Sequence, residues 1–237
     1  MAIHRRRTVI FIFLGVIFAA AGPVYGSDLA GRIRVSGPFA EPEKIAVKKD
    51  EALCGPEQFS EKLLISPEGY LRHAVVSLEG DFKEEFPAAA VPVPVLDQKN
   101  CRFTPHVLVV SSKQIFQVGN GDPTAHDVRA FDEAHMLFRF EMDPFQNPVE
   151  KKFEKPGRYV IRCGLHKWMH AIVISAEHPY YAVSDAEGNF QLKDIPAGKY
   201  ALKIWHETLG ETSVPVDLSG GSALDFRYTF TPKIHNA

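Results

Sequence analysis

The stretch Cys163-Gly-Leu-His166-Lys-Trp-Met169 places a thiol, an imidazole and a thioether close together in the chain. The segment before it, Phe153 to Cys163, contains a Pro-Gly turn signal and then an alternating run that is typical of a β-strand. The segment after it, Ala171-Ile-Val-Ile174, predicts the next strand. We therefore expect the three donors on a short loop between two paired strands, where a rigid scaffold can hold them at fixed distances.

These donor types favour copper. Thiolate and thioether sulfurs are soft ligands and imidazole suits copper, whereas magnesium and calcium prefer oxygen ligands. A second histidine is still needed, and the turn-rich loop from Val118 to Ala125 runs into a strand at His126. His126 is the predicted further ligand. His106, which follows Thr104-Pro105, is the main alternative, although its position at the start of a strand favours a structural or surface role.

Five pieces of sequence follow one another as they do in cupredoxins, and they resemble the amicyanin and plastocyanin group. The pieces are Phe103-Thr-Pro105, Asn120-Gly-Asp122, His126-Asp-Val128, Phe153-x-x-Pro-Gly-x-Tyr159 and Cys163-x-x-His166-x-x-Met169. The resemblance spans residues 97–176 and implies a Greek-key β-sandwich.

The same resemblance implies a blue-copper site with one type 1 copper ion. His126, Cys163 and His166 would form a trigonal set, with Met169 as a weak, long axial ligand. The resemblance also implies that His166 reaches the surface and lies on the electron path. Trp168 would either shield the metal from water or serve only as core packing.

Two positions depart from the cupredoxin pattern. Asp127 stands where the similar proteins carry asparagine, and its added negative charge is expected to favour copper(II) and lower the reduction potential. Lys167 stands where proline is common. Together with His170, Lys167 would offset Asp127 or attract an acidic partner. His135 and Met136 are a weaker candidate for a second soft metal site.

The rest of the chain also predicts strands and turns, so we expect an all-β fold. Residues 27–96 contain short apolar and alternating runs, and we expect an N-terminal β segment that lies beside the copper domain or forms a small sandwich. Residues 177–237 resemble the carboxypeptidase regulatory-like or transthyretin-like module, a small β-sandwich. That resemblance rests on Asp185-x-x-Gly188-x-Phe190 and Ile195-Pro-x-Gly198-x-Tyr200.

The first residues are typical of an export signal. Arg5, Arg6 and Arg7 precede an uncharged apolar run that ends before Pro23, and residues 1–26 are the predicted signal peptide. The run is short for a membrane span, although an uncleaved anchor is the alternative. We therefore expect a periplasmic protein without a membrane span after signal removal.

Three cysteines make an odd count for an exported chain. If Cys163 binds a metal, Cys54 and Cys101 remain, and an oxidising compartment favours a disulfide between them. Two free, buried thiols are the alternative, because spacing alone cannot show that the two residues approach each other.

Composition and motifs narrow the function. The formal net charge of −2 offers no basic surface for nucleic acid, and it becomes more negative when the three signal arginines leave. Nucleophile-elbow, phosphate-binding and His-x-His motifs are absent from the sequence, so we expect no enzyme and no small-molecule substrate. The predicted function is single-electron transfer between periplasmic redox partners. A copper-holding, delivery or docking protein is the alternative, and an empty cupredoxin-like domain is a third possibility.

Overall fold

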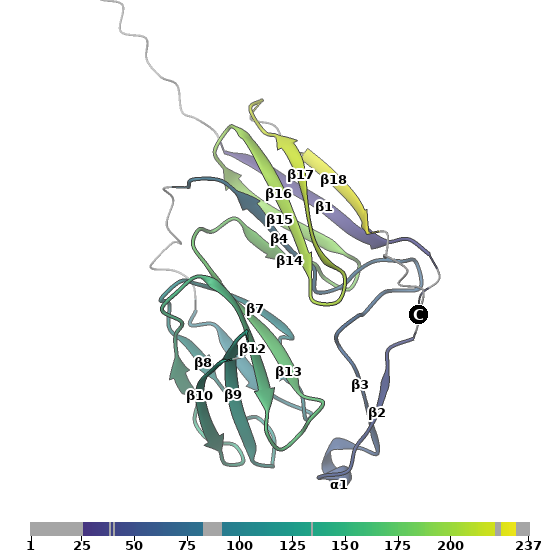
Figure 1. Cartoon of the computed structure of the whole chain (residues 1–237), viewed down its shortest axis with the longest axis vertical. Coiled ribbons are helices and arrows are strands. Elements are labelled where there is room, and N and C mark those ends of the chain that lie inside the picture. The colour runs from purple at the N-terminus through teal and green to yellow at the C-terminus, as the bar shows by residue number, and fades with distance from the viewer. Residues whose placement is uncertain are drawn as a thin grey trace, which may run out of the picture.

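The computed structural model describes residues 26–37, 39, 41–82, 92–133, 135–220 and 224–230. Within these ranges the chain is built from β-strands, and its one α-helix is the short α1 (Glu51–Cys54). The predicted all-β fold class is therefore confirmed. The strands form two β-sandwiches, which Figure 1 shows one above the other along the long axis of the molecule.

The first sandwich contains the predicted metal loop. Its larger sheet has the order β10 (His135–Met142), β9 (His126–Asp132), β12 (Gly157–Cys163), β13 (His170–Ala176) and β7 (Val107–Ser111). Its smaller sheet has the order β11 (Val149–Lys151), β8 (Phe116–Val118), β5 (Val95–Gln98) and β6 (Phe103–Thr104). Phe103, Phe116 and Ile161 belong to the buried core of this sandwich.

Strand register brings distant donors together. In β12 the alternating residues Tyr159, Ile161 and Cys163 are buried, as a strand with one face on the core requires. Cys163 pairs with Val128 of β9, so His126 lies two residues further along the neighbouring strand, on the same face. Residues far apart in the sequence thus meet at one end of the sheet.

The second sandwich is assembled from both ends of the chain. One sheet has the order β15 (Asn189–Ile195), β1 (Ser27–Val35) and β18 (Leu224–Phe230). The other has the order β14 (Tyr181–Val183), β4 (Val75–Glu79), β16 (Lys199–His206) and β17 (Gly210–Asp217). Leu29 and Ile33 of β1 join Leu202 and Ile204 of β16 in its core.

The strand pairing divides the chain differently from the contiguous segments 27–96 and 177–237 that we expected. β1 pairs with both β15 and β18, and β4 pairs with both β14 and β16. The N-terminal strands therefore complete the C-terminal sandwich instead of forming a unit of their own. The reason is that β15 and β18 are joined only through β1, so the sheet that they form requires the N-terminal strand.

An arm, residues 44–59, connects the second sandwich to the first. It consists of β2 (Lys44–Ala46), α1 and β3 (Glu57–Phe59), and Figure 1 shows it running down beside the first sandwich. A disulfide joins Cys54 of α1 to Cys101 of the first sandwich, with 5.5 Å between the Cα atoms. The predicted Cys54–Cys101 pairing is confirmed, and it fixes the arm against the first sandwich.

The two sandwiches also meet through a small apolar cluster. Val75 of the second sandwich is buried with Val107, Ile172 and Ile174 of the first, and Trp205 packs against them. Polar side chains from both sandwiches also lie near this apolar cluster.

Except for Gly26, the predicted signal peptide lies outside the described residues. In the described part of the chain, no helix is both long enough and apolar enough to span a bilayer.

Candidate metal centre

The loop between β12 and β13 has the short, closed form that its sequence predicts. The backbone N–H of Met169 donates to the carbonyl oxygen of His166 at 3.0 Å, and the N–H of Cys163 donates to that of Met169 at 3.1 Å. The loop thus leaves β12 at Cys163 and re-enters the sheet at His170. These backbone bonds hold the sulfur and the imidazole in a fixed relation.

Three of the four predicted ligands converge on one point. Cys163 Sγ lies 3.7 Å from His126 Nδ1 and 3.7 Å from His166 Nδ1, and the two Nδ1 atoms are 3.1 Å apart. A three-ligand set with bonds of about 2.0 Å to nitrogen and about 2.3 Å to sulfur has sulfur–nitrogen separations of about 3.7 Å. The residues present therefore fit one bound metal ion.

Carboxylates orient both imidazoles. His126 Nε2–H donates to Asp122 at 3.1 Å, and His166 Nε2–H donates to Asp50 at 2.8 Å. Each bond leaves Nδ1 free to act as a ligand, and partners of this kind fix ring orientation at metal sites. The sequence analysis missed both roles. Asp122 lies in the turn-rich loop that leads to His126, and this position was a signal for its role. Nothing in the sequence connected Asp50 of the arm to His166.

The surroundings of Cys163 favour ionisation of its thiol. Burial opposes ionisation of Cys163 most strongly, but hydrogen bonds with the imidazoles of His126 and His166 outweigh it. Together with backbone N–H groups they lower the pKa of Cys163 to about 5. The thiolate, which is the form that binds metals, is therefore available at neutral pH.

The expectation that His166 reaches the surface is wrong. His166 and His126 are fully buried, and Cys163 is 3% exposed. Asp50 of the arm covers His166 from one side, and the ring of Trp168 lies beside it with 5.1 Å between the centroids. Trp168 Nε1–H also donates to the carbonyl oxygen of Cys101 at 2.9 Å, which ties the loop to the disulfide.

Met169, His106 and His135 lie in different surroundings. Met169 is buried in the same core cluster as Cys163, which is compatible with an axial ligand. His106 lies outside the sulfur site and contacts Glu207 instead. His135 and Met136 are exposed at the start of β10, and no described histidine, cysteine or carboxylate pair joins His135 in a metal-binding group.

The charge of Asp127 is neutralised by two arginines, which corrects its expected electrostatic role. Arg129 Nε and Arg139 Nε donate to its two carboxylate oxygens at 2.9 and 2.8 Å. Burial opposes ionisation, but the two guanidinium groups hold the pKa of Asp127 below its usual value. Asp127 therefore does not present an uncompensated negative charge to the thiolate.

Gly164 makes the tight packing beneath the loop possible. Its N–H donates to the carbonyl oxygen of Asp127 at 2.7 Å, and an added Cβ would overlap the Asp127 carboxylate and the Arg129 guanidinium. We expect Gly164→Ala to lower the free energy of unfolding by about 1–3 kcal/mol, because overpacking must displace the ion pair of Asp127 and Arg129. Urea unfolding would measure the change.

Gly220→Ala is the matched control, because a Cβ at Gly220 meets nothing within 4 Å. Equal stability of Gly164→Ala and Gly220→Ala would show that the packing beneath the loop leaves room for a Cβ at position 164.

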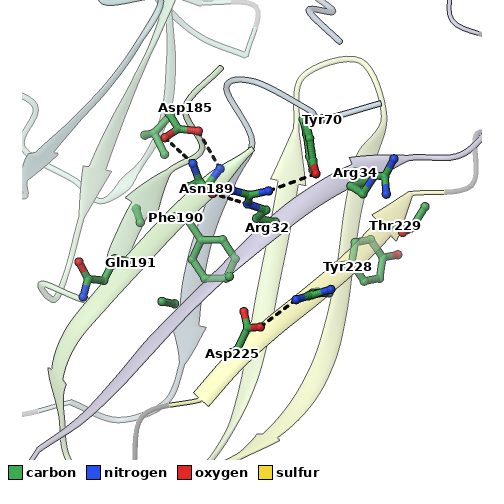
Figure 2. Close-up of a pocket in the computed structure, with 15 residues that line it drawn as sticks. Arg32, Arg34, Tyr70, Asp185, Asn189, Phe190, Gln191, Asp225, Tyr228 and Thr229 are labelled. Atoms are coloured by element: carbon green, nitrogen blue, oxygen red, sulfur yellow. Dashed lines mark hydrogen bonds and ion pairs between the residues drawn. The ribbon is translucent and has the colours of Figure 1, made fainter. Parts of the chain in front are cut away.

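A hollow on the second sandwich has a different character. It lies over β15, β1 and β18, with a volume of about 940 Å³. Figure 2 shows Arg32 held between Asn189 and Tyr70. Arg227 pairs with Asp225 at 3.3 Å. Its lining contains neither cysteine nor histidine, so it is not a candidate metal centre.

Comparisons with known proteins add a likeness of fold. No family model matches the chain, and no curated protein matches it. Among solved structures, a purple cupredoxin from Nitrosopumilus maritimus matches 35% of this chain and 96% of its own, with 20% identity and a TM-score of 0.31. Amicyanin from Paracoccus versutus matches 43% of this chain and 97% of its own, with 20% identity and a TM-score of 0.32.

A copper-containing nitrite reductase from Thermus scotoductus SA-01 matches 40% of this chain but only 25% of its own, with 22% identity and a TM-score of 0.32. At these scores and identities the likeness assigns neither a ligand nor an activity.

Proposed function

We propose that the protein binds one copper ion through His126, Cys163 and His166, with Met169 as a weak fourth ligand, and carries single electrons between redox partners outside the cytoplasm. The convergence of one sulfur and two Nδ1 atoms, separated by 3.7, 3.7 and 3.1 Å, is the observation that carries this proposal. One thiolate and two imidazoles are the donor set of blue-copper sites.

Rigidity of the donors supports electron transfer. Copper supplies reversible one-electron chemistry, and fast transfer requires that its ligands move little between the two oxidation states. The chain meets this requirement by placing His126 and Cys163 on paired strands and by bonding both imidazoles to carboxylates. The ligand side chains therefore have little freedom to move when the oxidation state of the copper changes.

Burial supports a carrier in preference to an enzyme. Catalytic metal sites keep a coordination position open to substrate. Here both imidazoles are fully buried, the cysteine is nearly so, and the arm covers His166. A substrate would have to displace the disulfide-linked arm or the core to reach either imidazole.

The surface nearest to the sulfur favours an acidic redox partner. Cys163 and Gly164 line a cleft between the sandwiches, together with the exposed side chains of Arg162 and Lys167. Since the arm blocks approach from the His166 side, we propose that the partner docks over this cleft. A disulfide in the chain also agrees with the proposed periplasmic location.

The decisive test of function is electrochemical. We expect the copper-loaded protein to show a reversible one-electron wave and fast electron self-exchange, because its donors are held in place. Copper should remain bound in the presence of a competing chelator. An irreversible wave, combined with ready loss of copper to the chelator, would instead support the alternative of a copper-holding or delivery protein.

A further inference from the structure

A second group of donor side chains lies between the two sandwiches. His106 precedes β7 and His170 begins β13, both in the first sandwich, whereas Glu207 lies in the turn between β16 and β17 of the second. His170 Nε2 is 3.1 Å from Glu207 Oε2, and His106 Nε2 contacts Glu207 Oε1. One donor atom from each residue lies within 4.8 Å of the other two.

The surroundings of His106 are those of a metal-binding histidine. Its side chain is fully buried, and its Nδ1 has no hydrogen-bond partner. On that side the carboxylate of Glu61 lies with Oε2 at 4.0 Å from Nδ1. Histidines that bind metals through one ring nitrogen commonly direct the other nitrogen toward a carboxylate. Glu61 is held there by Arg102, whose Nη1 lies 3.5 Å from its Oε1, and an ion pair with Glu207 alone leaves His106 Nδ1 without a partner.

We propose that His106, His170 and Glu207 form a second metal site, which takes Zn²⁺ and joins the two sandwiches. Two imidazole nitrogens and a carboxylate are a ligand set of three-ligand zinc sites, whose fourth position takes water or another small ligand. That position has access to solvent, because His170 and Glu207 line the cleft of about 710 Å³ between the sandwiches. The site shares no ligand with the sulfur site.

The test is a zinc titration of protein that carries one equivalent of copper. Isothermal calorimetry and metal analysis after dialysis should show one Zn²⁺ per chain with the copper retained. Glu207→Gln, which keeps the size of the side chain, should weaken zinc binding by at least about 10-fold, because it removes the charged ligand. Glu211→Gln is the matched control, since Glu211 lies in the same hairpin but pairs with Arg158.

The same titration of Cys163→Ser separates this proposal from the proposed copper function. One zinc equivalent that persists in Cys163→Ser, and is lost when Glu207→Gln is added, supports the second site even if copper binding fails. His170→Gln should behave as Glu207→Gln does, and circular dichroism of each variant shows whether it is folded. Absence of a zinc equivalent, or equal affinity in Glu207→Gln, His170→Gln and Glu211→Gln, would overturn the proposal.

Discussion

His126→Ala should abolish the intense visible band of the copper-loaded protein, whereas His106→Ala should retain it. The reason is that His126 Nδ1 lies 3.7 Å from Cys163 Sγ, so its loss leaves the sulfur with a single imidazole partner. His106 contacts Glu207 through Nε2, its Nδ1 has no hydrogen-bond partner, and neither nitrogen belongs to the sulfur site. Absorption spectra and copper stoichiometry of the two variants would measure the difference.

This pair of variants is well matched, because both remove a fully buried imidazole that contacts a carboxylate. A general loss of packing would affect both variants alike. Loss of the band in His106→Ala, together with its retention in His126→Ala, would overturn the ligand assignment.

Removing the disulfide should cost more stability than Gly164→Ala or the loss of Asp50, which also spare the metal donors. The bond between Cys54 and Cys101 spans a sequence separation of 47 residues. In the chain-entropy model a loop of this length contributes about 4 kcal/mol. We therefore expect the double variant Cys54→Ser/Cys101→Ser to lose about that amount of unfolding free energy in urea, and to lose more of it than any single surface change would cost.

The same variant should loosen the cover over the metal centre, because Asp50 reaches His166 from the arm that the disulfide holds. Hydrogen exchange should become faster in residues 44–59. Asp50→Ala is the control, since it removes the contact with His166 but keeps the disulfide, and it should cost only about 1–3 kcal/mol. A double serine variant as stable as the wild type would contradict the role given to the arm.

Sequence reasoning succeeded where the information is local. The interval from Cys163 to Met169 lies between two strands that the alternating pattern predicts, so the loop and its donors follow from neighbouring residues. His126 was predicted to join them because a turn-rich loop leads into its strand, and its Nδ1 lies 3.7 Å from Cys163 Sγ. The disulfide was predicted by elimination once Cys163 had been assigned to the metal.

The failures concern pairings between distant residues. The pattern of β1 predicts a strand, but nothing local says that it lies between β15 and β18. Likewise, Asp50 contacts His166 only because the arm folds back over the first sandwich. The burial of His166 follows from that contact, which a resemblance limited to residues 97–176 could not include.

Electrostatic expectations failed for a related reason. Asp127 was predicted to act on the copper through its charge, yet Arg139 reaches it from the neighbouring strand β10. The cluster of His106, His170 and Glu207 escaped notice because Glu207 belongs to the other sandwich. In each case a partner far along the chain changes the role of a residue.

The most direct measurement of the central claim is X-ray absorption at the copper edge, recorded for the copper-loaded protein and for Cys163→Ser. We predict one short copper–sulfur bond and two copper–nitrogen bonds per copper ion, with loss of the short sulfur bond in Cys163→Ser. Copper surrounded only by nitrogen and oxygen, or an identical spectrum in Cys163→Ser, would contradict the account.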